Sequence, residues 1–163
     1  MKKTVITLAA FLAMNMGTGF AAPINDLSQG QTALGIGTDT FYIEHKLSDK
    51  FTLGFQNNDY DNIGDMEDIY GQFGLNSNLR GIIGSRNFSY DSEAYLGLAV
   101  NNAIAPQADG YASIIAGSSF KEFEIGTNVK LSHNTDLNLN YHNFMPDEGR
   151  DRNGVGVGAT VKF

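Results

Sequence analysis

The chain has 163 residues, room for one domain, with 18% charged residues, 19 glycines and a formal net charge of −7. It contains no cysteine and no tryptophan, which excludes disulfide bonds and thiolate metal sites. The acidic balance argues against a nucleic-acid partner. A mean hydropathy of −0.21, without a long apolar run after the first residues, excludes a bundle of membrane-spanning helices.

The first 21 residues have the pattern of a secretory signal peptide. Two lysines precede an apolar stretch that is too short to span a bilayer. Gly19 and Ala21 are the small residues that signal peptidase requires, and cleavage after Ala21 keeps Pro23 away from the cut. The sequence therefore predicts a signal peptide over 1–21, followed by a periplasmic lead-in over 22–30.

From residue 31 onward the dominant pattern has a period of two. Over 155–163 every second residue is apolar, and the residues between are Gly, Thr or Lys. The stretches 121–131, 67–75 and 51–56 repeat this alternation, and no window shows the spacing of an amphipathic helix. Alternation of this kind is typical of strands with one apolar face. The sequence predicts an all-β domain over 31–163.

Connections of two kinds separate these strands. Three polar turns are short, and the strand before each ends in Leu; they lie at 47–51, 75–79 and 131–137. Three other connections are expected to be longer loops; they lie at 57–66, 87–92 and 145–152. Short turns at one end and long loops at the other are typical of outer-membrane barrels, whose short turns face the periplasm.

Ten strand segments can be counted. They lie at 31–38, 40–47, 51–57, 67–75, 79–87, 93–100, 110–118, 121–131, 136–144 and 153–163. Bacterial single-chain barrels have an even number of strands, which returns both termini to one side. The sequence thus predicts a closed antiparallel transmembrane β-barrel of ten strands. Eight strands is the alternative, because the first hairpin requires a tight turn at 37–40.

Aromatic residues are expected to form girdles at the two membrane interfaces. Those assigned to the long-loop end are Phe41, Phe88, Phe120, Phe123 and Phe144, and those assigned to the other end are Phe51, Tyr111 and Phe163. A soluble β-sandwich or a lipocalin-like core would also contain such rings, but it would not explain why the outward residues are apolar on every strand.

Charged residues of both signs share the inward face of the expected strands. They are Glu44, Lys46, Asp68, Arg80, Arg86, Glu122, Glu124, Lys130 and Lys162. A charge in a narrow, poorly hydrated space requires a partner, because its desolvation is costly. Two interpretations stay open at this point. The charges close the interior as a structural network, or they line a narrow, porin-like channel for small solutes.

The acidic stretch 57–68 is partly similar to a calcium-binding loop. The weak candidate ligands are Asp59, Asp61, Asp65 and Glu67. Ile63 and Tyr70 stand where such a loop needs oxygen ligands, so we predict no metal ion and no cofactor. A solvated acidic tip, or one bridged through ions to lipopolysaccharide phosphates, fits the residues better. Arg150 and Arg152 are further candidates for contact with anionic headgroups.

Small outer-membrane barrels include lipid A acyl hydrolases, which need a serine within reach of a histidine base. His142 is expected to face the lumen near the outer rim, but Asn143 and Phe144 follow it where a serine is needed. His133 follows Ser132 in an expected turn. The sequence therefore predicts no catalysis, and a lipid A acyl hydrolase remains the second alternative after a channel.

The chain ends on an alternating strand with Phe163 as its last residue, which looks like the signal read by bacterial barrel-assembly machinery. The chain also resembles the YfaZ-type outer-membrane proteins in its Gly-rich stretch 33–37, the acidic stretch 57–68 and the stretch 147–153. This resemblance implies an outer-membrane location and brings no assigned activity. We expect a monomer in the Gram-negative cell envelope, with a structural or surface-interaction role. Its expected partners are outer-membrane lipid, lipopolysaccharide and the assembly machinery.

Overall fold

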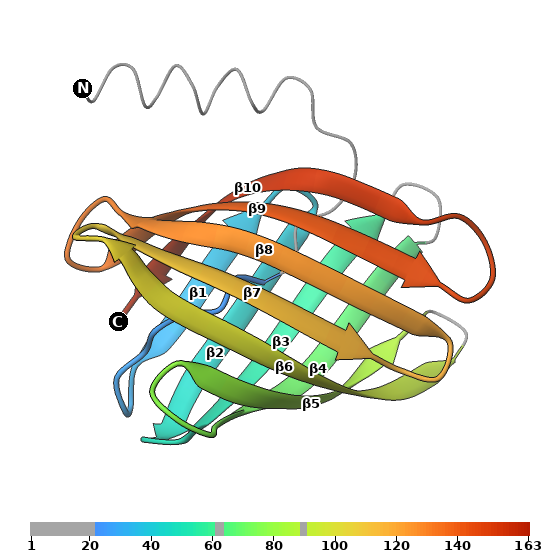
Figure 1. The fold of residues 1–163 in the computed structure, drawn as a ribbon, viewed down its shortest axis with the longest axis horizontal. Helices are drawn as coiled ribbons and strands as arrows, with labels where there is room; N and C mark the ends of the chain where they lie inside the picture. The colour runs from blue at the N-terminus through green and yellow to red at the C-terminus, as the bar shows by residue number, and fades with distance from the viewer. Residues whose placement is uncertain (1–21, 61–63, 89–90) are drawn as a thin grey trace.

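The computed structural model describes residues 22–60, 64–88 and 91–163. Across these ranges ten strands form one closed antiparallel barrel in which each strand pairs with its sequence neighbours and β1 pairs with β10 (Figure 1). The strands are β1 (Thr32–Gly37), β2 (Thr40–Ser48), β3 (Phe51–Tyr60), β4 (Gly64–Gly74), β5 (Leu79–Asn87), β6 (Ser92–Ala105), β7 (Ala108–Ala116), β8 (Phe120–Lys130), β9 (Thr135–Pro146) and β10 (Arg152–Lys162). The prediction of ten strands is confirmed, and the alternative of eight is wrong. No helix within the described ranges has the length and hydropathy needed to cross a membrane.

The first hairpin has the tight turn that a ten-strand barrel requires. Thr38 and Asp39 alone separate β1 from β2, and Gly37 is the register partner of Thr40. Asp39 has a φ of 55°, in the left-handed region that two-residue hairpin turns use. Asp tolerates this region better than most residues with a side chain. The turn therefore forms with Asp where Gly would be the usual choice.

Two of the three expected loops are shorter than the sequence suggests. β3 continues to Tyr60 and β4 starts at Gly64, so most of the expected loop 57–66 is paired strand. β9 extends to Pro146, and only two residues separate Ala105 from Ala108 at the opposite end. The expected loops 57–66 and 145–152 are therefore shorter than predicted, whereas the connection from Asn87 to Ser92 has the predicted bounds. Hydrogen bonds between the strand backbones continue beyond the residues with apolar alternation, because they join backbone N–H and C=O groups and do not depend on the side chains.

The barrel has an apolar exterior and a polar interior. Large apolar side chains are exposed around the outer wall, among them Leu96 at 66%, Ile69 at 62% and Ile83 at 62%. Buried positions include many polar side chains, such as Asn138 and Thr160. A soluble protein has the opposite arrangement. An apolar outer wall and a closed edge suit a barrel in lipid, where no water is available to backbone groups.

Several rings expected in the girdles point into the barrel instead. Phe120, Phe144 and Tyr111 are nearly fully buried, and Phe88 packs against the first two. Phe41 and Phe123 do face outward. The girdle prediction is therefore wrong for Phe88, Phe120, Phe144 and Tyr111. Phe120 is two residues from Glu122 on β8, and Phe144 is two residues from His142 on β9. Every second residue of a strand faces the same side, so the strand pleat directs these rings to the lumen together with the polar side chains.

Four lumen tyrosines each cover a glycine on the neighbouring strand. The register partners are Gly35 with Tyr42, Gly54 with Tyr70, Gly84 with Tyr95, and Gly126 with Tyr111. At every one of these glycines an added Cβ would lie within 2.5 Å of the tyrosine side chain. The ring therefore occupies the space that a side chain would need. Cross-strand packing of this kind fixes register and stiffens the wall.

Gly84 gives a direct test of these pairs. A Cβ at Gly84 would lie 2.4 Å from Cζ of Tyr95, whereas the nearest atom to a Cβ at Gly81 on the same strand is 3.9 Å away. We expect Gly84→Ala to lower the free energy of unfolding by about 1–3 kcal/mol, because Tyr95 must move in a packed lumen. Gly81→Ala is the matched control and should change it little. Urea unfolding in lipid vesicles measures both, and equal effects would contradict the assignment.

Candidate functional site

The segment before β1 lies inside the barrel. We expected a periplasmic lead-in over 22–30, but Ile24, Asn25 and Leu27 are buried against the lumen wall. Wall side chains bind the backbone of this segment. Asn128 Nδ2 donates to the Ile24 carbonyl (2.9 Å), Arg80 Nη1 donates to the Asn25 carbonyl (2.7 Å), and Gln56 Oε1 accepts from the Ala22 amide (3.0 Å). The segment thus fills the half of the lumen nearer the chain termini.

Glu44 is the centre of the polar network around this segment. Its carboxylate accepts hydrogen bonds from Asn25 Nδ2 (2.8 Å), Tyr70 Oη (3.0 Å) and Gln72 Nε2 (2.7 Å). Gln72 in turn accepts from Arg80 Nη1 at 3.0 Å. A buried carboxylate needs several hydrogen-bond donors from the protein, because they replace the water molecules that would otherwise solvate it. The network ties Asn25 to strands β2, β4 and β5.

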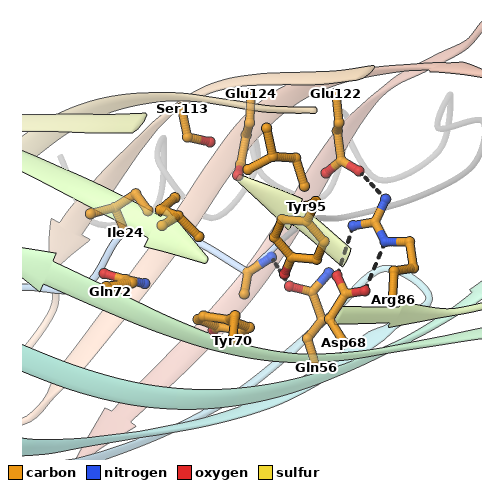
Figure 2. Close-up of a pocket in the computed structure, with 13 residues that line it drawn as sticks. Ile24, Gln56, Asp68, Tyr70, Gln72, Arg86, Tyr95, Ser113, Glu122 and Glu124 are labelled. Atoms are coloured by element: carbon orange, nitrogen blue, oxygen red, sulfur yellow. Dashed lines mark hydrogen bonds and ion pairs between the residues drawn. The ribbon is translucent and has the colours of Figure 1, made fainter. Parts of the chain in front are cut away.

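A second network spans the lumen on the side away from the termini. Figure 2 shows Arg86 between Asp68 and Glu122. Its Nε and Nη2 donate to the two oxygens of Asp68 at 2.7 Å each, and its Nη1 donates to Glu122 Oε2 at 2.6 Å. Asp68 comes from β4, Arg86 from β5 and Glu122 from β8. The paired guanidinium therefore connects separate parts of the wall across the interior.

Aromatic rings cover the Arg86 network. Arg86 is 1% exposed. Its Cζ lies 4.7 Å from the ring centre of Phe120 and 5.7 Å from those of Phe144 and Tyr95. Rings at these distances attract a cation and exclude water from its ion pairs. We call Arg86, Asp68, Glu122 and these rings the lumen seal.

The other predicted lumen charges also lie on the inward face. Lys162 Nζ lies 2.7 Å from Asp136, and Lys130 Nζ lies 3.0 Å from Asp109 at the more exposed end. Glu124 accepts from Tyr111 Oη at 2.8 Å and from Asn140 Nδ2 at 2.5 Å. Lys46 is half-buried, without an ion pair among the described residues. Every predicted lumen charge except Lys46 thus has an ion-pair or hydrogen-bond partner.

Sequence reasoning missed Asp136, Asp109 and Asn25. Asp136 has the same parity as Asn138 and Asn140 on β9, and this signal could have placed it beside Lys162. Asp109 falls between the expected strands 93–100 and 110–118, in a stretch where the structure has strand β7 from Ala108 onward. Asn25 lies in a segment without periodicity, so no pattern in the sequence indicates its burial.

Little open space remains in the interior. A cavity of about 50 Å³ lies between the N-terminal segment and the lumen seal. Ile24, Gln56, Tyr95 and Glu124 are among the residues that line it (Figure 2). A space of this size suits one or a few water molecules that bond to polar walls. It is too small for a solute of the size that ligand pockets usually hold.

The weak metal candidates do not converge. Asp59, Asp65 and Glu67 are exposed on the outer face of β3 and β4, while Asp61 lies outside the described residues. Asp68, next to Glu67, points to the lumen because successive strand residues face opposite sides. Within the described ranges no group of three or more His, Asp or Glu side chains could hold a metal ion.

His142 is fully buried in the lumen and lies in a row with Glu124 and Ser113. Glu124 is the register partner of both, Ser113 on β7 and His142 on β9. The serine and the histidine are therefore two strands apart, about 10 Å at normal strand spacing. A serine hydrolase needs the histidine between the serine and the carboxylate. This row has the carboxylate in the middle.

The two arginines near the last hairpin lie at the mouth of the barrel. Arg152 is the register partner of Phe144, so its side chain is on the lumen side of β10 and not against lipid. Arg150 lies in the exposed connection between β9 and β10. Both line a pocket of about 580 Å³ at this end of the barrel.

No protein-family model and no curated protein sequence matches the chain. Among solved structures it is similar to the KdgM porin, at 11% identity and a TM-score of 0.47, over 82% of this chain and 98% of that one. It is similar to the N-terminal β-barrel domain of Pseudomonas aeruginosa OprF at 12% identity and a TM-score of 0.44, over 83% and 98%. A de novo designed transmembrane β-barrel has 12% identity and a TM-score of 0.44, over 85% and 100%. Likeness at this level carries no functional argument, and the resemblance to YfaZ-type proteins stays a prediction.

Proposed function

We propose that the protein is a small outer-membrane β-barrel with a structural or surface-interaction role, a closed lumen and no catalytic activity. The observation that carries this proposal is that two obstacles occupy the lumen. The N-terminal segment fills one half, and the lumen seal crosses the other. A barrel near the small end of the size range is filled by side chains, whereas much wider barrels enclose a channel.

The apolar exterior supports the membrane location. A closed sheet leaves no free edge, so the barrel needs no second copy to complete its backbone pairing. Phe163 is exposed at the end of the chain, beside Thr32, with which it exchanges two backbone hydrogen bonds. This position leaves its ring available to the assembly machinery. Export through residues 1–21 and assembly through Phe163 belong to the same proposal.

Single tryptophans test whether the outer wall contacts lipid, since the chain has none of its own. We expect the emission of Leu98→Trp and Ile125→Trp to be strongly quenched in vesicles of brominated phosphatidylcholine, because both side chains are exposed on the wall. Phe120→Trp is the matched inward control and should be quenched little. Equal quenching at all three positions would contradict the predicted orientation of the wall.

Conductance tests the closed lumen. Purified protein in a planar bilayer should produce no discrete current steps, because the N-terminal segment and the lumen seal block the interior. A shift in gel migration on boiling is the control for folding, since a closed barrel resists denaturation by detergent until it is heated. Steps from protein that passes this control would favour the alternative of a narrow channel, which the polar lumen also suits.

The row of Ser113, Glu124 and His142 supports the absence of acyl-hydrolase activity. The histidine is not placed to deprotonate this serine, and both lie in an interior that lipid cannot enter. Expression of the protein should leave the acyl chains of lipid A unchanged in mass spectra. Loss of an acyl chain that His142→Ala abolishes would overturn this part of the proposal.

A further inference from the structure

The mouth pocket is separate from the filled lumen. It measures about 580 Å³ and is lined by Phe88, Phe120 and Phe144, by Pro146 and by Arg150 and Arg152, together with neighbouring loop residues. This volume falls in the usual range for small-molecule sites. Phe120 and Phe144 belong to the lumen seal, and Arg86 Cζ lies 4.7 Å from the ring centre of Phe120, so the pocket is closed at its base. A molecule that enters it can bind but cannot pass.

The base of the pocket is a fixed aromatic cluster. The ring centres of Phe88 and Phe120 are 5.6 Å apart at an interplanar angle of 72°, and those of Phe120 and Phe144 are 5.7 Å apart. Phe120 and Phe144 are held from below by Arg86, whereas Phe88 is only partly buried. Edge contacts of this kind are favourable and orient the rings. Phe88 therefore offers a preformed apolar surface to a guest.

Two guanidinium groups border this apolar surface without a carboxylate partner. Neither Arg150 nor Arg152 forms an ion pair within the described part of the chain. Arg152 is also half-buried. Two carboxylates, Asp147 and Glu148, line the same pocket; Asp147 lies 3.9 Å from Lys121 Nζ, and Glu148 is exposed and forms no ion pair within the described part of the chain. A half-buried guanidinium favours a carboxylate that it can bind with two hydrogen bonds.

We propose that the mouth pocket is a binding site for a small aromatic carboxylate, with the ring on Phe88 and the carboxylate on Arg152 and Arg150. This inference names a class of ligand for the proposed surface-interaction role. It rests on the proposed function, because the membrane location proposed there decides which side of the membrane the pocket faces. The closed base makes the site a receptor for the ligand and not an entrance to a channel.

Fluorine NMR titration of the purified barrel tests the site with three probes of one shape. They are 4-(trifluoromethyl)benzoate, 4-(trifluoromethyl)benzyl alcohol and 4-(trifluoromethyl)benzylamine. We expect the benzoate to bind about tenfold more tightly than the alcohol, the difference that a hydrogen bond to a charged group supplies. The amine should bind most weakly. Equal affinities, or preference for the amine, would overturn the proposal.

Matched variants separate the two parts of the site. Arg152→Gln should remove the preference for the benzoate over the alcohol, while Phe88→Ala should weaken all three probes. Lys50→Gln removes an exposed cation from the turn between β2 and β3, away from the pocket, and should change nothing; if it acts like Arg152→Gln, the effect is general charge and the proposal fails. Arg150→Gln is the second arginine variant where Arg152→Gln does not fold. The shift in gel migration on boiling shows whether each sample contains a closed barrel. A closed barrel that shows no preference for the benzoate contradicts the proposed binding site and leaves the proposed function standing.

Discussion

Replacement of Arg86 by methionine should lower the free energy of unfolding by about 3–5 kcal/mol, the usual cost of removing one partner from a buried ion pair. The substitution leaves the carboxylates of Asp68 and Glu122 buried, each of which now lies within 2.7 Å of the guanidinium. It also removes the cation beneath the ring of Phe120. Urea unfolding in lipid vesicles, followed by the loss of heat-shifted migration, measures the change.

A triple variant shows whether the cost comes from the unpaired charges. Arg86→Met combined with Asp68→Leu and Glu122→Leu removes all three charges, and it should recover most of the stability because apolar side chains of similar volume can replace a buried ionic network. Arg150→Met removes an exposed arginine and serves as the control. An Arg86→Met variant no less stable than the control would mean that the ion pairs of Arg86 contribute nothing to stability.

The lumen shows what strand parity can and cannot predict. Parity alone directs Arg86, Asp68 and Glu122 inward, and the structure has all three there. It does not predict that Arg86 of β5 binds Glu122 of β8, because contact across the lumen depends on barrel closure and on the length of each side chain. The same parity applied to Phe120 and Phe144 would have assigned them to the interior. The expectation of aromatic girdles assigns these two rings to a membrane interface instead, so it does not predict the aromatic part of the lumen seal.

The strand ends and the N-terminal segment depend on information that no local pattern contains. β3 continues through Asn58 and Asp59, which have no apolar alternation, because the register with β4 continues to Gly64. Asn25 is buried because the ten-stranded wall leaves space that the wall side chains do not fill, and its own neighbours give no sign of this. Both features follow from the closed barrel as a whole.

Removal of residues 23–28 should open one half of the lumen without making the barrel conduct. Asn128 is 2% exposed in the intact protein, and its side chain binds the Ile24 carbonyl of the removed segment. We expect Asn128→Cys to resist a water-soluble maleimide in the full barrel and to react in the shortened one about as fast as Ser132→Cys, which lies in an exposed turn. The chain has no cysteine of its own, so each variant reports one position.

The shortened barrel should still give no current steps in a planar bilayer, because the Arg86 ion pairs and the rings above them lie in the other half of the lumen. The two obstacles act in series, so removal of either one leaves the path closed. Steps from the shortened barrel would mean that the N-terminal segment is the sole obstacle, and would favour a channel that this segment closes. Protection of Asn128→Cys in both forms would instead contradict the assignment of residues 23–28 as the filling of this half.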